Sequence, residues 1–136
     1  MPGDCYLLDT SALLTLRDDE PGADRVVELL ALSQQNKSRC SGCFMTLMEV
    51  YYRVWKDEGE SAGRLAYQQC LSLPMTWIHE TPALLERAAA AKAVYRLSLA
   101  DAWIAASAEL SHAVLVHKDP EFEPLPVRQE LLPYKW

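Results

Sequence analysis

The sequence contains no apolar run long enough to cross a membrane, which takes about 20 consecutive apolar residues. Its longest weakly polar stretch, residues 88–113, is interrupted by Lys92, Arg96, Asp101 and Glu109. The first residues also lack the basic stretch, apolar run and small-residue cleavage site of a secretory signal. We therefore expect a cytoplasmic protein that makes no contact with a membrane.

Basic residues are scarce: 13 Lys and Arg stand against 19 Asp and Glu, giving a formal net charge of −6. This balance argues against a protein that wraps nucleic acid by bulk electrostatics. It leaves open an enzyme that holds nucleic acid locally through metal ions. With 136 residues, half of them hydrophobic, the composition is typical of one folded domain, residues 1–136.

Cysteine and histidine are also few. The four cysteines, Cys5, Cys40, Cys43 and Cys70, are expected to be reduced core residues. The segment Cys40-Ser-Gly-Cys43 is a lone Cys-x-x-Cys within an expected strand, whereas redox pairs begin helices and zinc sites need a second pair. The histidines are scattered and show no metal-ligand spacing: His79, His112 and His117.

Short apolar runs alternate with segments of helical periodicity along the whole chain. Strands are expected at residues 5–8, 40–45, 75–79 and 113–116, with a short final strand near 127–131. Helices are expected near residues 12–16, 26–32, 46–57, 65–73, 84–95 and 98–110. This alternation predicts an α/β fold with a mostly parallel sheet of four to five strands and helices on both faces.

Acidic residues recur where the expected strands end. Asp9 ends the first strand, Glu49 lies in the first turn of the helix after the second, and Asp119 follows the fourth. Asp101 begins the helix that leads to the fourth strand, and Glu121 comes two residues after Asp119. Ligands of open α/β sheets bind beyond the carboxyl ends of the strands, so we expect these side chains to gather at one edge.

Each carboxylate also fits a structural role. Helix caps account for Asp9 and for the segments Thr46-x-x-Glu49 and Ser98-x-x-Asp101, and a turn accounts for Asp119. Taken together, however, carboxylates crowded at one edge repel one another unless some are protonated or a cation is bound. Hard oxygen ligands suit Mg²⁺ or Mn²⁺, and such ions activate water and neutralise phosphate charge.

Four segments occur in the order seen in PIN domains: Leu7-Leu-Asp9-Thr10-Ser11-Ala12-Leu13-Leu14, Thr46-x-x-Glu49-Val50, Leu99-Ala-Asp101-Ala-Trp-Ile-Ala-Ala106 and Leu115-Val-His-Lys-Asp119-Pro-Glu121-Phe122. The sequence thus resembles the PIN-domain family, and most of all the VapC toxins of type II toxin–antitoxin pairs. The resemblance covers nearly the whole chain. It implies a PIN-like three-layer sandwich, a homodimer, and a cognate antitoxin as partner.

The resemblance also assigns roles to individual residues. It implies that a catalytic quartet holds one or two divalent ions: Asp9, Glu49, Asp101 and Asp119. Glu121 matches a secondary acidic position, and Ser11 matches a polar residue that supports the first aspartate. His117 departs from the family, which often has Thr or Ser two residues before the last aspartate. His117 either bonds a phosphate or Asp119, or packs at the end of the strand.

Two further groups of residues are candidates for contacts with partners. One is either helix core or a groove that receives an antitoxin helix: Tyr51, Tyr52, Trp55, Leu65 and Tyr67. The other comprises candidates for phosphate contacts: Arg17, Arg53, Lys56, Arg64, Lys92, Arg96 and Lys118.

The leading hypothesis is therefore a Mg²⁺- or Mn²⁺-dependent endoribonuclease that acts as a toxin on single-stranded or looped RNA. The rival is a catalytically silent PIN-like module that binds RNA or protein, and the intact quartet favours the enzyme. A haloacid-dehalogenase-type phosphatase also begins with a strand-end aspartate, but it needs a second aspartate two residues later. Ser11 occupies that position here.

Overall fold

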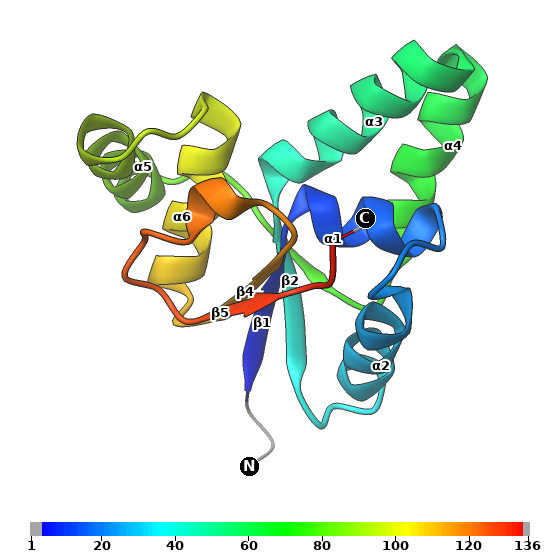
Figure 1. The fold of residues 1–136 in the computed structure, drawn as a ribbon, viewed down its shortest axis with the longest axis horizontal. Helices are drawn as coiled ribbons and strands as arrows, with labels where there is room; N and C mark the ends of the chain where they lie inside the picture. The colour runs from blue at the N-terminus through cyan, green and yellow to red at the C-terminus, as the bar shows by residue number, and fades with distance from the viewer. Residues whose placement is uncertain (1–3, 135–136) are drawn as a thin grey trace.

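The computed structural model describes residues 4–134. The elements follow the order β1 (Cys5–Leu8), α1 (Thr10–Arg17), α2 (Ala23–Gln34), β2 (Arg39–Cys43), α3 (Phe44–Glu58), α4 (Glu60–Leu71), β3 (Thr76–Ile78), α5 (Pro82–Val94), α6 (Leu99–Leu110), β4 (Val114–His117), the 3₁₀ turn η1 (Pro120–Phe122) and β5 (Gln129–Leu131). Five parallel strands form one sheet in the order β3-β2-β1-β4-β5 (Figure 1). The predicted α/β class is confirmed.

The sheet is the middle of three layers because its buried strands alternate their apolar side chains between two faces. Leu8 and Val116 pack with residues of α1, α2, α3 and α4 on one face. Leu7 and Leu115, their immediate neighbours in sequence, pack with α6 residues such as Ile104 on the other face.

Among the described residues, none of the helices combines the length and apolarity that a bilayer span requires.

Helices α3 and α4 form a hairpin that projects from the sheet (Figure 1). The close approach depends on Gly63, because a Cβ there would lie 2.8 Å from the carbonyl oxygen of Tyr51 and 2.9 Å from the Cβ of Trp55. Tyr51 stacks on Tyr67 across the hairpin, with 5.1 Å between ring centroids. Both helices thereby extend beyond the sheet while remaining packed on each other.

The boundary between β2 and α3 differs from the expectation. The helix begins at Phe44, two residues before the predicted start, and Cys43 is its N-cap without a side-chain hydrogen bond. Thr46 therefore lies inside the first turn, and the predicted Thr46-x-x-Glu49 capping box is wrong. The apolar run continues across the boundary, so the composition carries no mark of where the strand ends.

Two other predicted caps are confirmed. The hydroxyl of Ser98 accepts a 3.1 Å hydrogen bond from the backbone N–H of Asp101 at the start of α6. The carboxylate of Asp9 accepts a 3.0 Å bond from the backbone N–H of Ser11 at the start of α1. These caps fix the directions in which α1 and α6 leave the carboxyl edge of the sheet.

Candidate metal centre at the carboxyl edge of the sheet

Asp9 lies where β1 ends, and only 3% of its surface is exposed. Its backbone N–H donates to the carbonyl of Val116 on β4. Oδ2 accepts hydrogen bonds from Ser11, at 3.0 Å from the backbone N–H and at 2.5 Å from the hydroxyl. Oδ1 is buried and has no hydrogen-bond partner among the described residues. A buried carboxylate oxygen without a donor is costly, which marks Oδ1 as an available ligand atom.

Ser11 makes the contact to the first aspartate that was expected of it. Its hydroxyl donates to Asp9 and also accepts a 2.9 Å hydrogen bond from the backbone N–H of Lys118. Because Lys118 directly precedes Asp119, this one hydroxyl ties the end of β4 to the cap of α1. The first and last acidic positions are therefore held in register with each other.

Glu49 comes from the second turn of α3, and its carboxylate is nearly buried, with 7% of the residue exposed. Thr10 donates a 2.6 Å hydrogen bond to its Oε1, and the hydroxyls of Thr10 and Thr46 are themselves hydrogen-bonded at 3.0 Å. Arg53, one turn further along α3, lies 3.4 Å from Oε2. Glu49 is thus held on both oxygens and placed beside Asp9.

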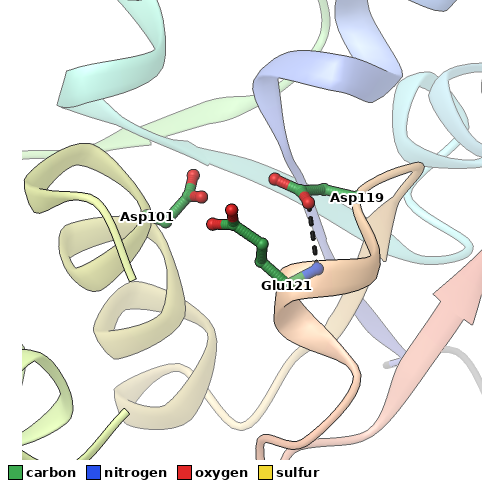
Figure 2. Close-up of side chains that lie close together, drawn as sticks. All are labelled: Asp101, Asp119 and Glu121. Atoms are coloured by element: carbon green, nitrogen blue, oxygen red, sulfur yellow. Dashed lines mark hydrogen bonds between the residues drawn. The ribbon is translucent and has the colours of Figure 1, made fainter. Parts of the chain in front are cut away.

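Three other carboxylates converge from two segments far apart in sequence. Figure 2 shows Asp101 on α6 pointing toward Glu121 and Asp119 on the loop after β4. One carboxylate oxygen from each residue lies within 4.8 Å of the others. Asp119 Oδ1 also accepts a 3.0 Å hydrogen bond from the backbone N–H of Glu121, which fixes the loop in a tight turn. The turn expected at Asp119 is therefore present. It places the carboxylates of Asp119 and Glu121 near that of Asp101.

Among the described residues, Asp101, Asp119 and Glu121 form an acidic cluster with oxygens within 4.8 Å of one another, whereas Asp9 and Glu49 lie outside that group and act on Asp101 through their charge. Burial, followed by the negative charges of Asp9, Asp119, Glu49 and Glu121, raises the pKa of Asp101 to about 8. Burial also raises the pKa of Asp9, although the hydrogen bonds from Ser11 oppose the shift and Glu49 adds to it. A bound cation would relieve this repulsion, as the sequence pattern suggested.

His117 is fully buried at the end of β4, and its contacts decide between the roles expected of it. Nδ1 accepts a 3.0 Å hydrogen bond from the backbone N–H of Asp119, and Nε2 lies 2.8 Å from Oε1 of Gln129. The ring also packs edge-on against Phe122, with 5.1 Å between centroids. Both nitrogens are occupied within the fold, which leaves neither for a phosphate.

Sequence reasoning missed three residues that build this site. Thr10 holds Glu49, Thr46 is hydrogen-bonded to Thr10, and Gln129 is hydrogen-bonded to His117. Thr10 had a local signal, since it lies between Asp9 and Ser11 in the Asp-Thr-Ser segment. Thr46 was attributed to a cap, and Gln129 lies in an edge strand that carries no recognisable motif.

The basic residues divide into those already engaged and those still available. Arg17 binds Glu58 with two hydrogen bonds of 2.7 and 2.9 Å, and Lys118 is nearly buried beside Glu20 and the carbonyl of Pro21. The remaining pairings or contacts are Arg64 with Glu60, Lys92 with the carbonyl of Leu97, and Arg53 with Glu49. Within residues 4–134, the side chains of Lys56 and Arg96 form no ion pair. Among these basic residues, Arg53 contacts Glu49.

The cysteine motif is part of the core. Cys40 and Cys43 are fully buried on opposite faces of the sheet, and Cys70 is buried in α4. Burial raises the pKa of the Cys40 and Cys70 thiols to about 11, so they remain protonated and unreactive at neutral pH. This agrees with the predicted role of these cysteines as small core residues.

Comparisons with known proteins agree with this architecture. The model of the PIN domain family matches residues 6–127, and the chain therefore belongs to the PIN-domain family. No curated protein matches the sequence.

Several solved structures share the fold. VapBC2 from Rickettsia felis, bound to a promoter DNA fragment, has 18% sequence identity and a TM-score of 0.76, over 95% of this chain and 99% of that one. A toxin–antitoxin complex from Klebsiella pneumoniae has 25% identity and a TM-score of 0.67, over 96% and 99%. VapC20 from Mycobacterium tuberculosis, a sarcin–ricin loop cleaving toxin, has 18% identity and a TM-score of 0.72, over 94% and 99%. The predicted resemblance to VapC toxins is confirmed at the level of the fold.

Proposed function

We propose that this protein is a divalent-metal-dependent endoribonuclease and the toxin of a type II toxin–antitoxin pair. The observation that carries the proposal is the buried, unpartnered Oδ1 of Asp9, whose charge acts on Asp101 in the acidic cluster of Asp101, Asp119 and Glu121. A helix cap needs only one carboxylate oxygen, and Asp9 satisfies that need with Oδ2. The second oxygen is explained by a ligand.

The residues present fit Mg²⁺ or Mn²⁺. All the candidate ligand atoms are carboxylate oxygens, which these hard cations prefer, and no histidine or thiolate lies in the set. Asp9, Asp101 and Asp119 would hold the ion, with Glu49 and Glu121 as further acidic groups of the site. A bound ion would supply an activated water and neutralise charge on the phosphate during hydrolysis.

Two of the chain's own residues bear on proton transfer and on the binding of RNA. His117 is excluded as a general base, because both ring nitrogens are engaged inside the fold. Arg53, with 46% of its side chain exposed, lies beside Glu49 and can contact an RNA phosphate that approaches the cluster. An acidic edge with few free cations favours a flexible single strand or loop over a rigid duplex.

The test is cleavage of single-stranded RNA by the purified protein in Mn²⁺ or Mg²⁺, with EDTA as the metal-free control. Groups that only orient metal ligands typically change activity by about 10- to 100-fold, and Asp9→Asn should reduce cleavage by more than that. Asp24→Asn, at an exposed aspartate in the first turn of α2, is the matched control and should cleave like the parent. A silent binding module would bind RNA without cutting it, and Asp9→Asn would leave its RNA affinity unchanged.

The cognate antitoxin is proposed to bind beside α1, α3 and α4. A mainly apolar cavity of about 280 Å³ lies between these helices, lined by Leu13, Leu16, Val50, Ala66, Cys70 and Leu73 together with the polar Arg17 and Gln69. On the hairpin, Tyr52, Trp55 and Leu65 are 42 to 55% exposed. These three residues, which the sequence left open as either helix core or groove, are therefore surface residues. An amphipathic helix fits such a groove.

Leu65→Glu, which places a charge on the exposed face of the hairpin near this cavity, should abolish inhibition by the co-expressed antitoxin while RNA cleavage persists. Inhibition that survives this change would place the antitoxin elsewhere. We also propose a homodimer, and sedimentation that gives a monomer at high micromolar concentration would contradict it.

A further inference from the structure

The loop after β4 carries two carboxylates of the acidic cluster yet has little regular structure of its own. Asp119 and Glu121 lie in and beside the single turn η1, beyond the hydrogen bonds that join β4 to β5. The charges of Asp119 and Glu121 repel each other within this loop, and ionised Asp101 would add to the repulsion. Some part of the fold must therefore hold the loop toward α6.

One side chain is bonded to backbone carbonyls within this loop. Nε2 of Gln129, on β5, donates hydrogen bonds to the carbonyl of Phe122 at 2.8 Å and to the carbonyl of Leu125 at 3.2 Å. Its Oε1 lies 2.8 Å from Nε2 of His117. Gln129 is partly buried, and Phe122 is fully buried against the His117 ring.

These contacts define the hydrogen-bonding state of His117. Nδ1 faces the backbone N–H of Asp119, so Nδ1 must be the acceptor nitrogen. Oε1 of Gln129 can only accept, so Nε2 of His117 carries the hydrogen. These contacts place a hydrogen on Nε2 and leave Nδ1 as the acceptor, so Gln129 and the backbone N–H of Asp119 favour the same tautomer of the ring.

We propose that Gln129 is a positioning residue for the acidic cluster, acting through His117 to orient Asp119 and through the loop carbonyls to orient Glu121. This inference rests on the proposed metal-dependent function. Gln129 touches neither RNA nor an ion; it sets the backbone from which two carboxylates project. Such outer contacts typically change metal affinity or activity by about 10- to 100-fold.

The first variant is Gln129→Met, which keeps the length of the side chain and removes both of its hydrogen-bonding groups. Titration with Mn²⁺ should show an affinity about 10- to 100-fold below that of the parent, with cleavage reduced in parallel. The ¹⁵N spectrum of the histidine ring should show that the Nε2–H tautomer of His117 is no longer the single form. A purely structural role would lower the melting temperature but leave Mn²⁺ affinity and the tautomer unchanged, which would overturn the inference.

A matched pair at His117 separates the two bonds of the ring. His117→Asn places an amide oxygen near the position of Nδ1, so it keeps an acceptor for Asp119 and should retain more Mn²⁺ affinity. His117→Gln reaches the position of Nε2 instead, so it keeps the bond to Gln129 and should lose more. Equal Mn²⁺ affinities for the two variants would contradict the proposal that His117 acts through its bond to Asp119.

The controls distinguish this inference from the proposed function. If Asp101→Asn abolishes Mn²⁺ binding while Gln129→Met binds as the parent does, the metal centre stands and the positioning role fails. If the parent itself binds no Mn²⁺ and cleaves no RNA, the proposed function fails, and the positioning role fails with it. Because Gln129 is only partly buried, its variant remains informative even where a change at the buried His117 prevents folding.

Discussion

The hydroxyl of Thr10 donates a 2.6 Å hydrogen bond to the carboxylate of Glu49, joining the start of α1 to α3 across 39 residues of sequence. Thr10→Val keeps the shape of the side chain and removes this donor. We expect RNA cleavage and Mn²⁺ affinity to fall by about 10- to 100-fold, because the carboxylate loses the group that orients it. The measurements are Mn²⁺ titration and cleavage under single-turnover conditions.

Thr10→Ser is the control for this prediction, since it retains the hydroxyl and should stay close to the parent. A Thr10→Val variant that cleaves like the parent would show that Glu49 needs no fixed orientation. The same result would weaken the proposal that Glu49 belongs to a catalytic quartet.

The raised pKa of Asp101 predicts how the metal-free protein responds to pH. Asp101 keeps its proton up to about pH 8 when folded, whereas the unfolded chain ionises near the ordinary value of 3.8. The folded state therefore binds more protons in this window, so the contribution to stability is complete below pH 3.8 and is lost as pH rises through about 8. We expect the melting temperature in EDTA to fall between pH 5 and pH 8 on this account.

Asp101→Asn should flatten this dependence, because an amide stays neutral throughout. Addition of Mn²⁺ to the parent at pH 8 should raise the melting temperature, since the ion binds the ionised carboxylates of the folded state. An unchanged slope in Asp101→Asn would mean that the clustered charge does not govern stability.

A substitution at Gly63 should change stability in the direction opposite to that expected from helix propensity. Replacing glycine by alanine inside a helix ordinarily stabilises it by up to about 1 kcal/mol. Here the new Cβ would lie 2.8 Å from the carbonyl oxygen of Tyr51, so α3 and α4 must move apart. We expect Gly63→Ala to lower the free energy of unfolding by about 1–3 kcal/mol, as overpacking does.

Chemical denaturation of Gly63→Ala beside Ser61→Ala tests this prediction. Ser61 is exposed on the same helix, so its change should leave stability nearly unaltered. A stabilised Gly63→Ala would show that the hairpin tolerates a wider spacing.

The chemistry of the cleaved ends reports on the mechanism. An attack by water leaves a 5′-phosphate and a 3′-hydroxyl, whereas metal-free ribonucleases use the 2′-hydroxyl and leave a cyclic phosphate. With His117 buried and engaged, we expect 5′-phosphate products and complete inhibition by EDTA. Cyclic phosphate ends formed in EDTA would refute the metal mechanism, and ligation or mass spectrometry of the fragments distinguishes the two outcomes.

Much of this protein follows from interactions that are local in sequence. Leu7 and Leu8 reveal a strand buried on both faces, and the Ser98 cap lies three residues before Asp101. Helix periodicity and caps act over about four residues, so the sequence alone contains them. The convergence of Asp101, Asp119 and Glu121 was predictable because each lies where a strand of a parallel sheet ends or a helix begins.

Tertiary structure alone decided which groups support those carboxylates. Ser11 meets Lys118 across 107 residues, and Gln129 reaches His117 from a neighbouring strand. Such bonds depend on the register of β1 with β4 and of β4 with β5, and register is set by the packing of the whole core. The sequence therefore determined which side chains carry the charge, whereas the packed sheet determined how that charge is held, because hydrogen-bond geometry between distant segments exists only after the strands have paired.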